Sequence, residues 1–283
     1  MSSATLRLRD GRRLGYAQFG VPSGRPVLLF HGGSDSRLTR HPDDTIVESL
    51  GIRLVTIDRP GIGLSDYAPR RSLVGWVEDV EQLADSLGLE GFAVVGWSAG
   101  GPHALACAYI LPDRVRRIAV VAGLPPLDAN GAVAALPPFM RRLFVLARIS
   151  PLLAWPALGF VLSRTRGDLD RVAARYNEYL SECDREVLAQ PGILEAAILA
   201  KREAHARGLA SELTLLTKPW GFPLAEVRAP TTLWYGTEDL GCPPRVAEAL
   251  AAQLPDARVE IVQGQGHQLF YSRWREIMAD VSA

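Results

Sequence analysis

The sequence lacks several features that mark particular classes of protein. Its 31 lysines and arginines balance 31 aspartates and glutamates, and no long basic cluster occurs, so we expect no nucleic-acid partner. Cysteine is scarce: Cys107, Cys183 and Cys242 lie far apart and form no C-x-x-C pair, which indicates neither a zinc site nor a disulfide framework. No H-E-x-x-H motif, P-loop or strand-borne G-x-G-x-x-G is present, so we expect neither a metal nor a cofactor.

The usual marks of export and membrane insertion are also missing. The amino-terminal MSSATLRLRDGRR is polar and has no apolar core like that of a signal peptide, so we expect a cytoplasmic protein. Residues 143–162 have about the length of a membrane span, but Arg148, Pro151 and Pro156 interrupt them. We therefore expect two short apolar helices that meet at a proline turn, and no stable membrane insertion.

The sequence does contain short apolar runs that alternate with helical patterns. The first strands are expected to form a hairpin with Asp10-Gly11 at its turn. Later runs are continuous and apolar, as in parallel strands that are buried on both faces. These runs are residues 26–30, 52–58, 92–97, 115–123, 229–236 and 257–264. The order predicts an α/β fold with a mostly parallel, doubly wound sheet of about eight strands and helices on both faces.

The alternation stops in the middle of the chain. Between about Leu124 and Phe222 several helical patterns occur and no strand signal does. This predicts one α/β core in two parts, residues 1–124 and 223–283. A helical cap, residues 125–222, would be inserted between strands 6 and 7.

Ser98 is the strongest candidate for a chemical role, because it directly follows the apolar run of residues 92–97. It stands at the centre of GWSAG, residues 96–100. A strand that turns at once into a helix strains its corner residue, and glycines on both sides remove side chains that would clash there. A helix N-cap serine would suit the same position, but it does not explain the two glycines. We predict that Ser98 is a nucleophile.

A serine nucleophile needs a general base, and the chain has five histidines. Only His267 lies in a glycine-rich loop directly after a predicted core strand, and we predict that it is the base. The other four are better explained as structural residues, on predicted helices or within their own loop. They are His31, His41, His103 and His205.

The base in turn needs a carboxylate that holds its tautomer. Asp239 follows the strand that precedes the one leading to His267, so its side chain is expected at the same edge of the sheet. Glu238, the neighbour of Asp239, is a weaker candidate. Asp128 is another, because it follows a different strand end from which a carboxylate can approach the same site. Backbone N–H groups of Ala99 and Gly33 are the expected donors to a developing oxyanion.

These motifs resemble those of the α/β-hydrolase fold superfamily, in its capped, cytoplasmic form. The matching segments are HGG (31–33), DRPGIGLSD (58–66), GWSAGG (96–101), YGTEDLGCP (235–243) and GQGH (264–267). The order serine, aspartate, histidine is also that of the family. The resemblance covers the whole chain except residues 125–222, where the family carries a variable cap.

The resemblance implies a hydrolase that acts on an ester or a related acyl bond. Epoxide hydrolases and haloalkane dehalogenases place an aspartate at the position of Ser98, which argues against both. Two alternatives stay open: a ligand-binding receptor without hydrolytic activity, and a biosynthetic acyltransferase or cyclase on the same fold.

The substrate pocket is expected to include aromatic residues beside the nucleophile and in the cap. We expect a small to medium, largely apolar small-molecule substrate, because no cluster of like charges stands out in the cap. The sequence leaves the oligomeric state open and a homodimer is possible in principle. The predicted pocket residues are Trp97, Phe139, Phe144 and Trp155.

Overall fold

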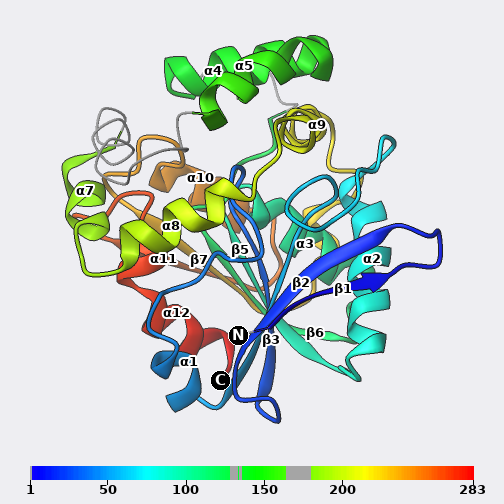
Figure 1. Cartoon of the computed structure of the whole chain (residues 1–283). Helices are drawn as coiled ribbons and strands as arrows, with labels where there is room; N and C mark the ends of the chain where they lie inside the picture. The colour runs from blue at the N-terminus through cyan, green and yellow to red at the C-terminus, as the bar shows by residue number, and fades with distance from the viewer. Residues whose placement is uncertain (1, 128–132, 134–135, 164–179) are drawn as a thin grey trace.

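An eight-stranded sheet forms the centre of the molecule (Figure 1). The computed structural model describes residues 2–127, 133, 136–163 and 180–283. The strands are β1 (Ser2–Arg7), β2 (Arg13–Gly20), β3 (Arg25–Phe30), β4 (Ile52–Ile57), β5 (Phe92–Trp97), β6 (Val115–Val121), β7 (Thr231–Gly236) and β8 (Ala257–Val262).

The strands lie in the order β1-β2-β4-β3-β5-β6-β7-β8. β2 pairs antiparallel with both β1 and β4, and every pair from β4 to β8 is parallel. The predicted hairpin and the predicted mostly parallel sheet are thus confirmed. All residues of β5 and β7 are buried, which explains why these strands are continuous apolar runs in the sequence.

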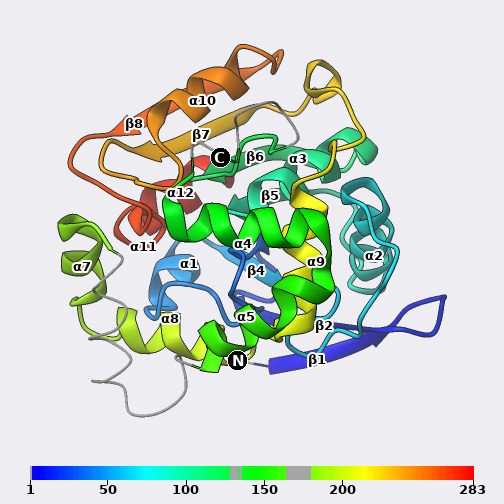
Figure 2. The ribbon, with the colours of Figure 1, turned by 90° about the horizontal axis from the view of Figure 1, so that it is seen from above.

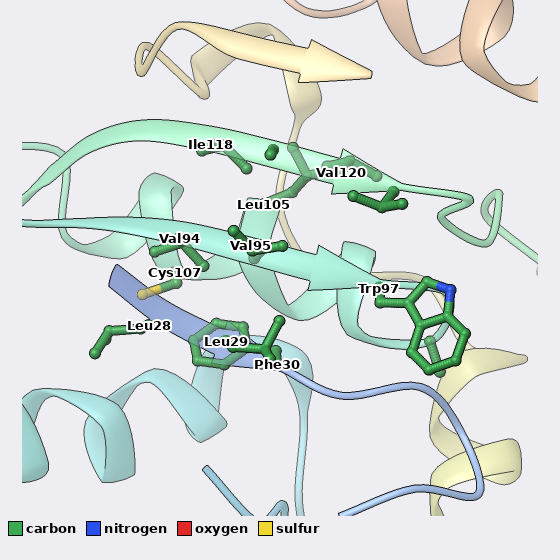
Figure 3. Close-up of a cluster of buried hydrophobic side chains, with 14 of the residues drawn as sticks. Leu28, Leu29, Phe30, Val94, Val95, Trp97, Leu105, Cys107, Ile118 and Val120 are labelled. Carbon is green, nitrogen blue, oxygen red and sulfur yellow. The ribbon is translucent and has the colours of Figure 1, made fainter. Parts of the chain in front are cut away.

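Helices cover both faces of the sheet. α2 (Leu73–Ser86) and α3 (Gly100–Ile110) lie on one face, and α1 (Thr45–Ser49) and α12 (Trp274–Val281) lie on the other (Figure 1). α10 (Pro244–Ala251) connects β7 to β8, and the short α11 (Leu269–Ser272) precedes α12. Side chains of β3, β5, β6 and α3 interlock in the core between sheet and helix (Figure 3).

The segment between β6 and β7, residues 122–230, contains helices and no strand in its described part. We call it the β6–β7 segment. Its helices are α4 (Pro138–Ile149), α5 (Pro151–Ser163), α7 (Glu182–Leu188), α8 (Ile193–Arg202), α9 (Ala206–Leu216) and the 3-10 turn η2 (Leu224–Glu226). α4, α5 and α9 pack on one another and lie in front of the central strands in the view from above (Figure 2).

The two short apolar helices predicted for residues 143–162 are present. α4 ends at Ile149, Ser150 leaves the helical conformation, and Pro151 begins α5. Of the helices in the described ranges, none has both the length and the apolar character that a bilayer crossing requires. One of the helical patterns expected between Leu124 and Phe222 spans residues 169–182, and it falls mostly outside the described residues.

Candidate active site

Ser98 occupies a strained turn between β5 and α3. Its φ is +54°, a left-handed conformation that is uncommon for residues other than glycine. A Cβ on Gly96 would lie 2.5 Å from the carbonyl oxygen of Gly100, and a Cβ on Gly100 would overlap the carbonyl oxygen of Phe30. The two glycines therefore let the turn pack closely against its surroundings, and Ser98 lies at its corner.

Hydrogen bonds hold the backbone of this turn. The N–H of Ser98 donates to the carbonyl of Val121 at the end of β6, at 2.9 Å. The carbonyl of Ser98 accepts from the N–H groups of Gly101 at 3.0 Å and Leu124 at 3.2 Å. The backbone of the strained residue is thus held by the end of β6 and the loop that follows it, and by the first turn of α3.

His267 and Asp239 form a hydrogen-bonded pair at the ends of β8 and β7. Nδ1 of His267 lies 2.8 Å from Oδ2 of Asp239. Oδ1 of Asp239 accepts the backbone N–H groups of Gly241 and Cys242, both at 2.8 Å, and its side chain is fully buried. A proton on Nδ1 satisfies the carboxylate and leaves Nε2 of His267 as an acceptor.

Trp97 connects this pair to the turn of Ser98. It is the last residue of β5 (Figure 3), and its Nε1–H donates to the carbonyl of His267 at 3.3 Å. The ring centroids of Trp97 and His267 are 5.7 Å apart. The histidine loop therefore lies against the residue that precedes Ser98. Among the described residues, no hydrogen bond joins the Ser98 hydroxyl to His267.

Two charged residues of the β6–β7 segment lie near the histidine. Asp184 of α7 is buried, and its Oδ1 accepts the N–H of Gln268 at 2.7 Å. Lys201 of α8 forms an ion pair with Asp35, which lies in the loop between β3 and α1. Burial lowers the pKa of His267 and Lys201 lowers it further, but Asp239, with a contribution from Asp184, outweighs them, so this pKa lies above its ordinary value of 6.5.

Two backbone N–H groups lie free beside Ser98. A Cβ on Gly33 would lie 3.7 Å from the Cβ of Ala99, so the two residues are neighbours. In the described part of the chain, neither N–H donates to a protein acceptor. N–H groups without a protein acceptor are the kind of donor that an oxyanion needs, so the predicted role of Gly33 and Ala99 stays a prediction.

Arg59 stabilises the loop that contains Gly33. Its guanidinium donates to the carbonyls of His31 and Gly32, the latter at 2.8 Å. Its Nε lies 3.0 Å from a carboxylate oxygen of Glu212 in α9, and all these groups are buried. A helix of the β6–β7 segment thereby supports the geometry of the loop through a buried ion pair.

The other carboxylates and histidines considered in the sequence analysis lie in varied surroundings. Glu238 is exposed and contacts its neighbour Thr237. His31 and His103 are buried, and burial together with the charge of Arg59 holds the pKa of both well below the usual range. His41 stacks on Trp274, and His205 contacts the carbonyl of Gly63. Asp128 lies outside the described residues.

The four predicted pocket residues have different surroundings. Trp97 is 2% exposed and stacks on Phe270, so it supports the histidine loop from below. Phe144 is buried within the β6–β7 segment, and Trp155 is exposed on α5 near Arg207. The side chain of Phe139 lies outside the described part of the structure. Contact of these residues with a substrate stays a prediction.

One group of described side chains has the composition of a metal site. Ligand atoms of Asp239, Cys242 and His267 lie within 4.8 Å of one another. Burial, with the nearby Asp239 charge, raises the pKa of the Cys242 thiol well above its usual value, which favours the protonated thiol. Because Asp239 and His267 already bond to each other, the group suits proton transfer better than metal binding.

Sequence reasoning missed four residues that support the site: Asp184, Lys201, Glu212 and Arg59. Arg59 stands in the DRPG segment that follows β4, and its position at a strand end was a usable signal. The other three lie on helices of the β6–β7 segment, where nothing in the local sequence indicates their distant partners.

Comparisons with known proteins agree with this fold. A family model described as "alpha/beta hydrolase fold" matches residues 25–273. A proline iminopeptidase from Xylella fastidiosa is 24% identical, over 94% of this chain and 90% of its own. An esterase from Thermogutta terrifontis superposes with a TM-score of 0.72 at 20% identity, with 99% of this chain and 97% of that chain covered. A bromoperoxidase from Bacillus anthracis gives a TM-score of 0.74, also at 20% identity and the same coverage. The structural likenesses establish the fold alone.

Proposed function

Because the chain belongs to the alpha/beta hydrolase fold family, we propose that it is a serine hydrolase with Ser98, His267 and Asp239 as its catalytic triad. The observation that carries the proposal is the His267–Asp239 pair, which lies against Trp97, the residue before the strained Ser98. A serine in a left-handed conformation is costly to maintain, and nucleophilic catalysis with His267 as the base gives a reason for the cost.

The proposed mechanism has two acyl-transfer steps. Nε2 of His267 takes the proton of the Ser98 hydroxyl while Oγ attacks the carbonyl carbon of the substrate. N–H groups of Gly33 and Ala99 stabilise the oxyanion, and His267 then protonates the leaving group as its bond to carbon breaks. Water, deprotonated by His267, attacks the acyl-enzyme, and His267 returns that proton to Oγ as its bond to the acyl carbon breaks, which releases the acid and free Ser98. This chemistry needs neither a metal nor a cofactor.

We propose an ester, or a related acyl compound, as the substrate. An aminoacyl substrate, as the name of the proline iminopeptidases suggests, would bring a cationic amine that needs an acidic partner. The described buried acids of the β6–β7 segment are already engaged: Glu212 with Arg59 and Asp184 with the N–H of Gln268. This supports a small to medium, largely apolar substrate. We also propose that residues 125–222 form a cap over it and that the protein is cytoplasmic.

The proposal is tested by a reactive probe together with a substrate panel. A fluorophosphonate probe is expected to label Ser98, identified by peptide mass spectrometry. p-Nitrophenyl esters of increasing acyl length are expected to be hydrolysed faster than prolyl p-nitroanilide. Labelling with negligible turnover of every compound would instead support a ligand-binding protein. Absence of labelling would contradict the serine mechanism.

The pH dependence of the reaction is expected to report on Asp184. The general base must be neutral, so kcat/KM falls as the pH drops through the pKa of His267. Asp184→Asn keeps an oxygen that can accept the N–H of Gln268 but removes a negative charge near His267. We therefore expect the acidic limb of the profile to move to lower pH, because the loss of charge lowers the pKa of His267.

A charge on the same helix provides the control for this experiment. Glu186→Gln removes an exposed charge of α7 and is expected to leave the profile in place. An acidic limb that stays fixed in Asp184→Asn, or moves to higher pH, would show that Asp184 does not act on His267.

A further inference from the structure

Large apolar side chains are exposed together on α4 and α5. Elsewhere in the described residues such side chains are scattered, as is normal for a protein surface. α5 has no charged residue and is apolar all around, yet only one of its faces is buried. A helix of this kind is normally buried on all sides, so its outer face calls for a partner. We call the following exposed residues the α4–α5 patch: Val145, Ile149, Leu152, Leu153 and Trp155.

The side chains of the patch are highly exposed although they are apolar. Its side chains range from 42% exposed for Trp155 to 70% exposed for Leu152. The opposite faces of the two helices are buried, with Phe144 on α4 and Leu158 on α5, and both helices pack on α9. The patch therefore points away from the body of the protein, on the outer side of helices that stand above the sheet (Figure 1).

The charged residues of α4 and α5 all have one sign. Residues 136–163 contain three arginines and neither aspartate nor glutamate. Arg141, Arg142 and Arg148 are exposed, and none of them forms an ion pair or a hydrogen bond with a described residue. Three unpaired cations beside exposed apolar side chains complement a surface that is both apolar and anionic.

A shallow hollow on α4 adds apolar surface beside the patch. It has a volume of about 360 Å³, is lined by Arg141, Arg142, Val145 and Leu146, and its accessible surface is almost entirely apolar. Arg141 and Arg142 therefore contribute the apolar stems of their side chains there, as long cationic side chains do where a charged head meets apolar surface.

We propose that the α4–α5 patch docks this protein on the surface of a bilayer that contains anionic phospholipids. α4 and α5 have 12 and 13 residues, which at 1.5 Å per residue is too short to cross the hydrocarbon core, so they lie in the interface. A second copy of the chain is a poorer occupant, because a symmetric dimer through this patch would bring like arginines together. The inference does not depend on the proposed reaction.

The test is co-sedimentation of the full-length protein with phosphatidylcholine vesicles, made with and without phosphatidylserine. We expect binding to the anionic vesicles that weakens at high salt. Replacement of Arg141, Arg142 and Arg148 by glutamine is expected to weaken that binding by about a hundredfold, since each cation contributes about fivefold. Ile149→Ser/Leu152→Ser/Leu153→Ser is expected to weaken it roughly tenfold or more, because less apolar area enters the interface.

Matched variants separate the patch from general charge and hydrophobicity. A glutamine triple at Arg7, Arg9 and Arg228 removes the same charge from exposed sites outside the patch, and Leu199→Ser removes an exposed leucine of α8. Both are expected to bind vesicles like the wild type. Circular dichroism shows whether each variant is folded.

Three results would overturn the proposal. The first is absence of vesicle binding at low salt, and the second is unchanged binding in both patch variants. The third is a lipid-free dimer in size-exclusion chromatography that the patch variants convert to a monomer, because it would identify a second copy as the occupant. Each result is read without substrate, so it is independent of whether the protein is a hydrolase.

Discussion

Ser98→Ala is expected to lower kcat for the best ester of the panel by about 10⁴-fold to 10⁶-fold. The alanine removes the only atom that forms the acyl-enzyme, while the free N–H groups of Gly33 and Ala99 stay in place. KM is expected to change little, because the hydroxyl adds little to binding in the ground state. Steady-state kinetics and loss of fluorophosphonate labelling measure the effect.

Ser34→Ala is the matched control for this variant. Ser34 also lies by the site, next to Gly33 and 3.5 Å from Lys201, but it has no strained backbone. We expect its kcat to stay within a few-fold of the wild type. Full activity of Ser98→Ala on the same ester would remove the core of the proposed mechanism.

Asp239→Asn is expected to lower kcat by about 10³-fold to 10⁴-fold with little change in fold. The asparagine oxygen can still accept the N–H groups of Gly241 and Cys242, which the carboxylate accepts at 2.8 Å. Its NH₂ group then faces Nδ1 of His267 as a donor. The imidazole proton moves to Nε2, where it prevents that nitrogen from taking the proton of Ser98.

Two other carboxylates provide the comparison. Glu238→Gln alters the exposed neighbour of Asp239 and is expected to keep near wild-type kcat. If Asp239→Asn is near wild type while Asp128→Asn is inactive, the acid of the triad comes from the end of β6 and our assignment is wrong. Thermal unfolding of each variant separates a loss of chemistry from a loss of fold.

Much of the fold could be predicted because the central strands carry their environment in their composition. β5 and β7 are buried along their whole length, so only apolar side chains with glycine and threonine occupy them. Asp10 and Gly11 mark the hairpin turn between β1 and β2 through local backbone preferences. Such features depend on a few adjacent residues, so they can be predicted without knowing which distant segment packs against them.

The turn at Ser98 could also be predicted from the sequence, for a related reason. Gly96 and Gly100 are dictated by close contacts of the turn with its own helix and with the end of β3. The residues that support the site could not be predicted from the sequence. Asp184, Lys201 and Glu212 act on loops that lie 84, 166 and more than 150 residues away along the chain, and a buried ion pair leaves no periodic pattern in either of its two segments.

The sequence by itself determined the strand positions, the helical character of the segment between β6 and β7, and the glycines that make the turn of Ser98 possible. Backbone preferences and burial act residue by residue, so the order of residues records them. Tertiary structure alone decided that Asp239 bonds to His267, that Asp184 and Lys201 set opposing charges near that histidine, and that α5 leaves an apolar face uncovered. These outcomes depend on which distant segments meet, because electrostatic and packing energies arise only when both partners are in contact.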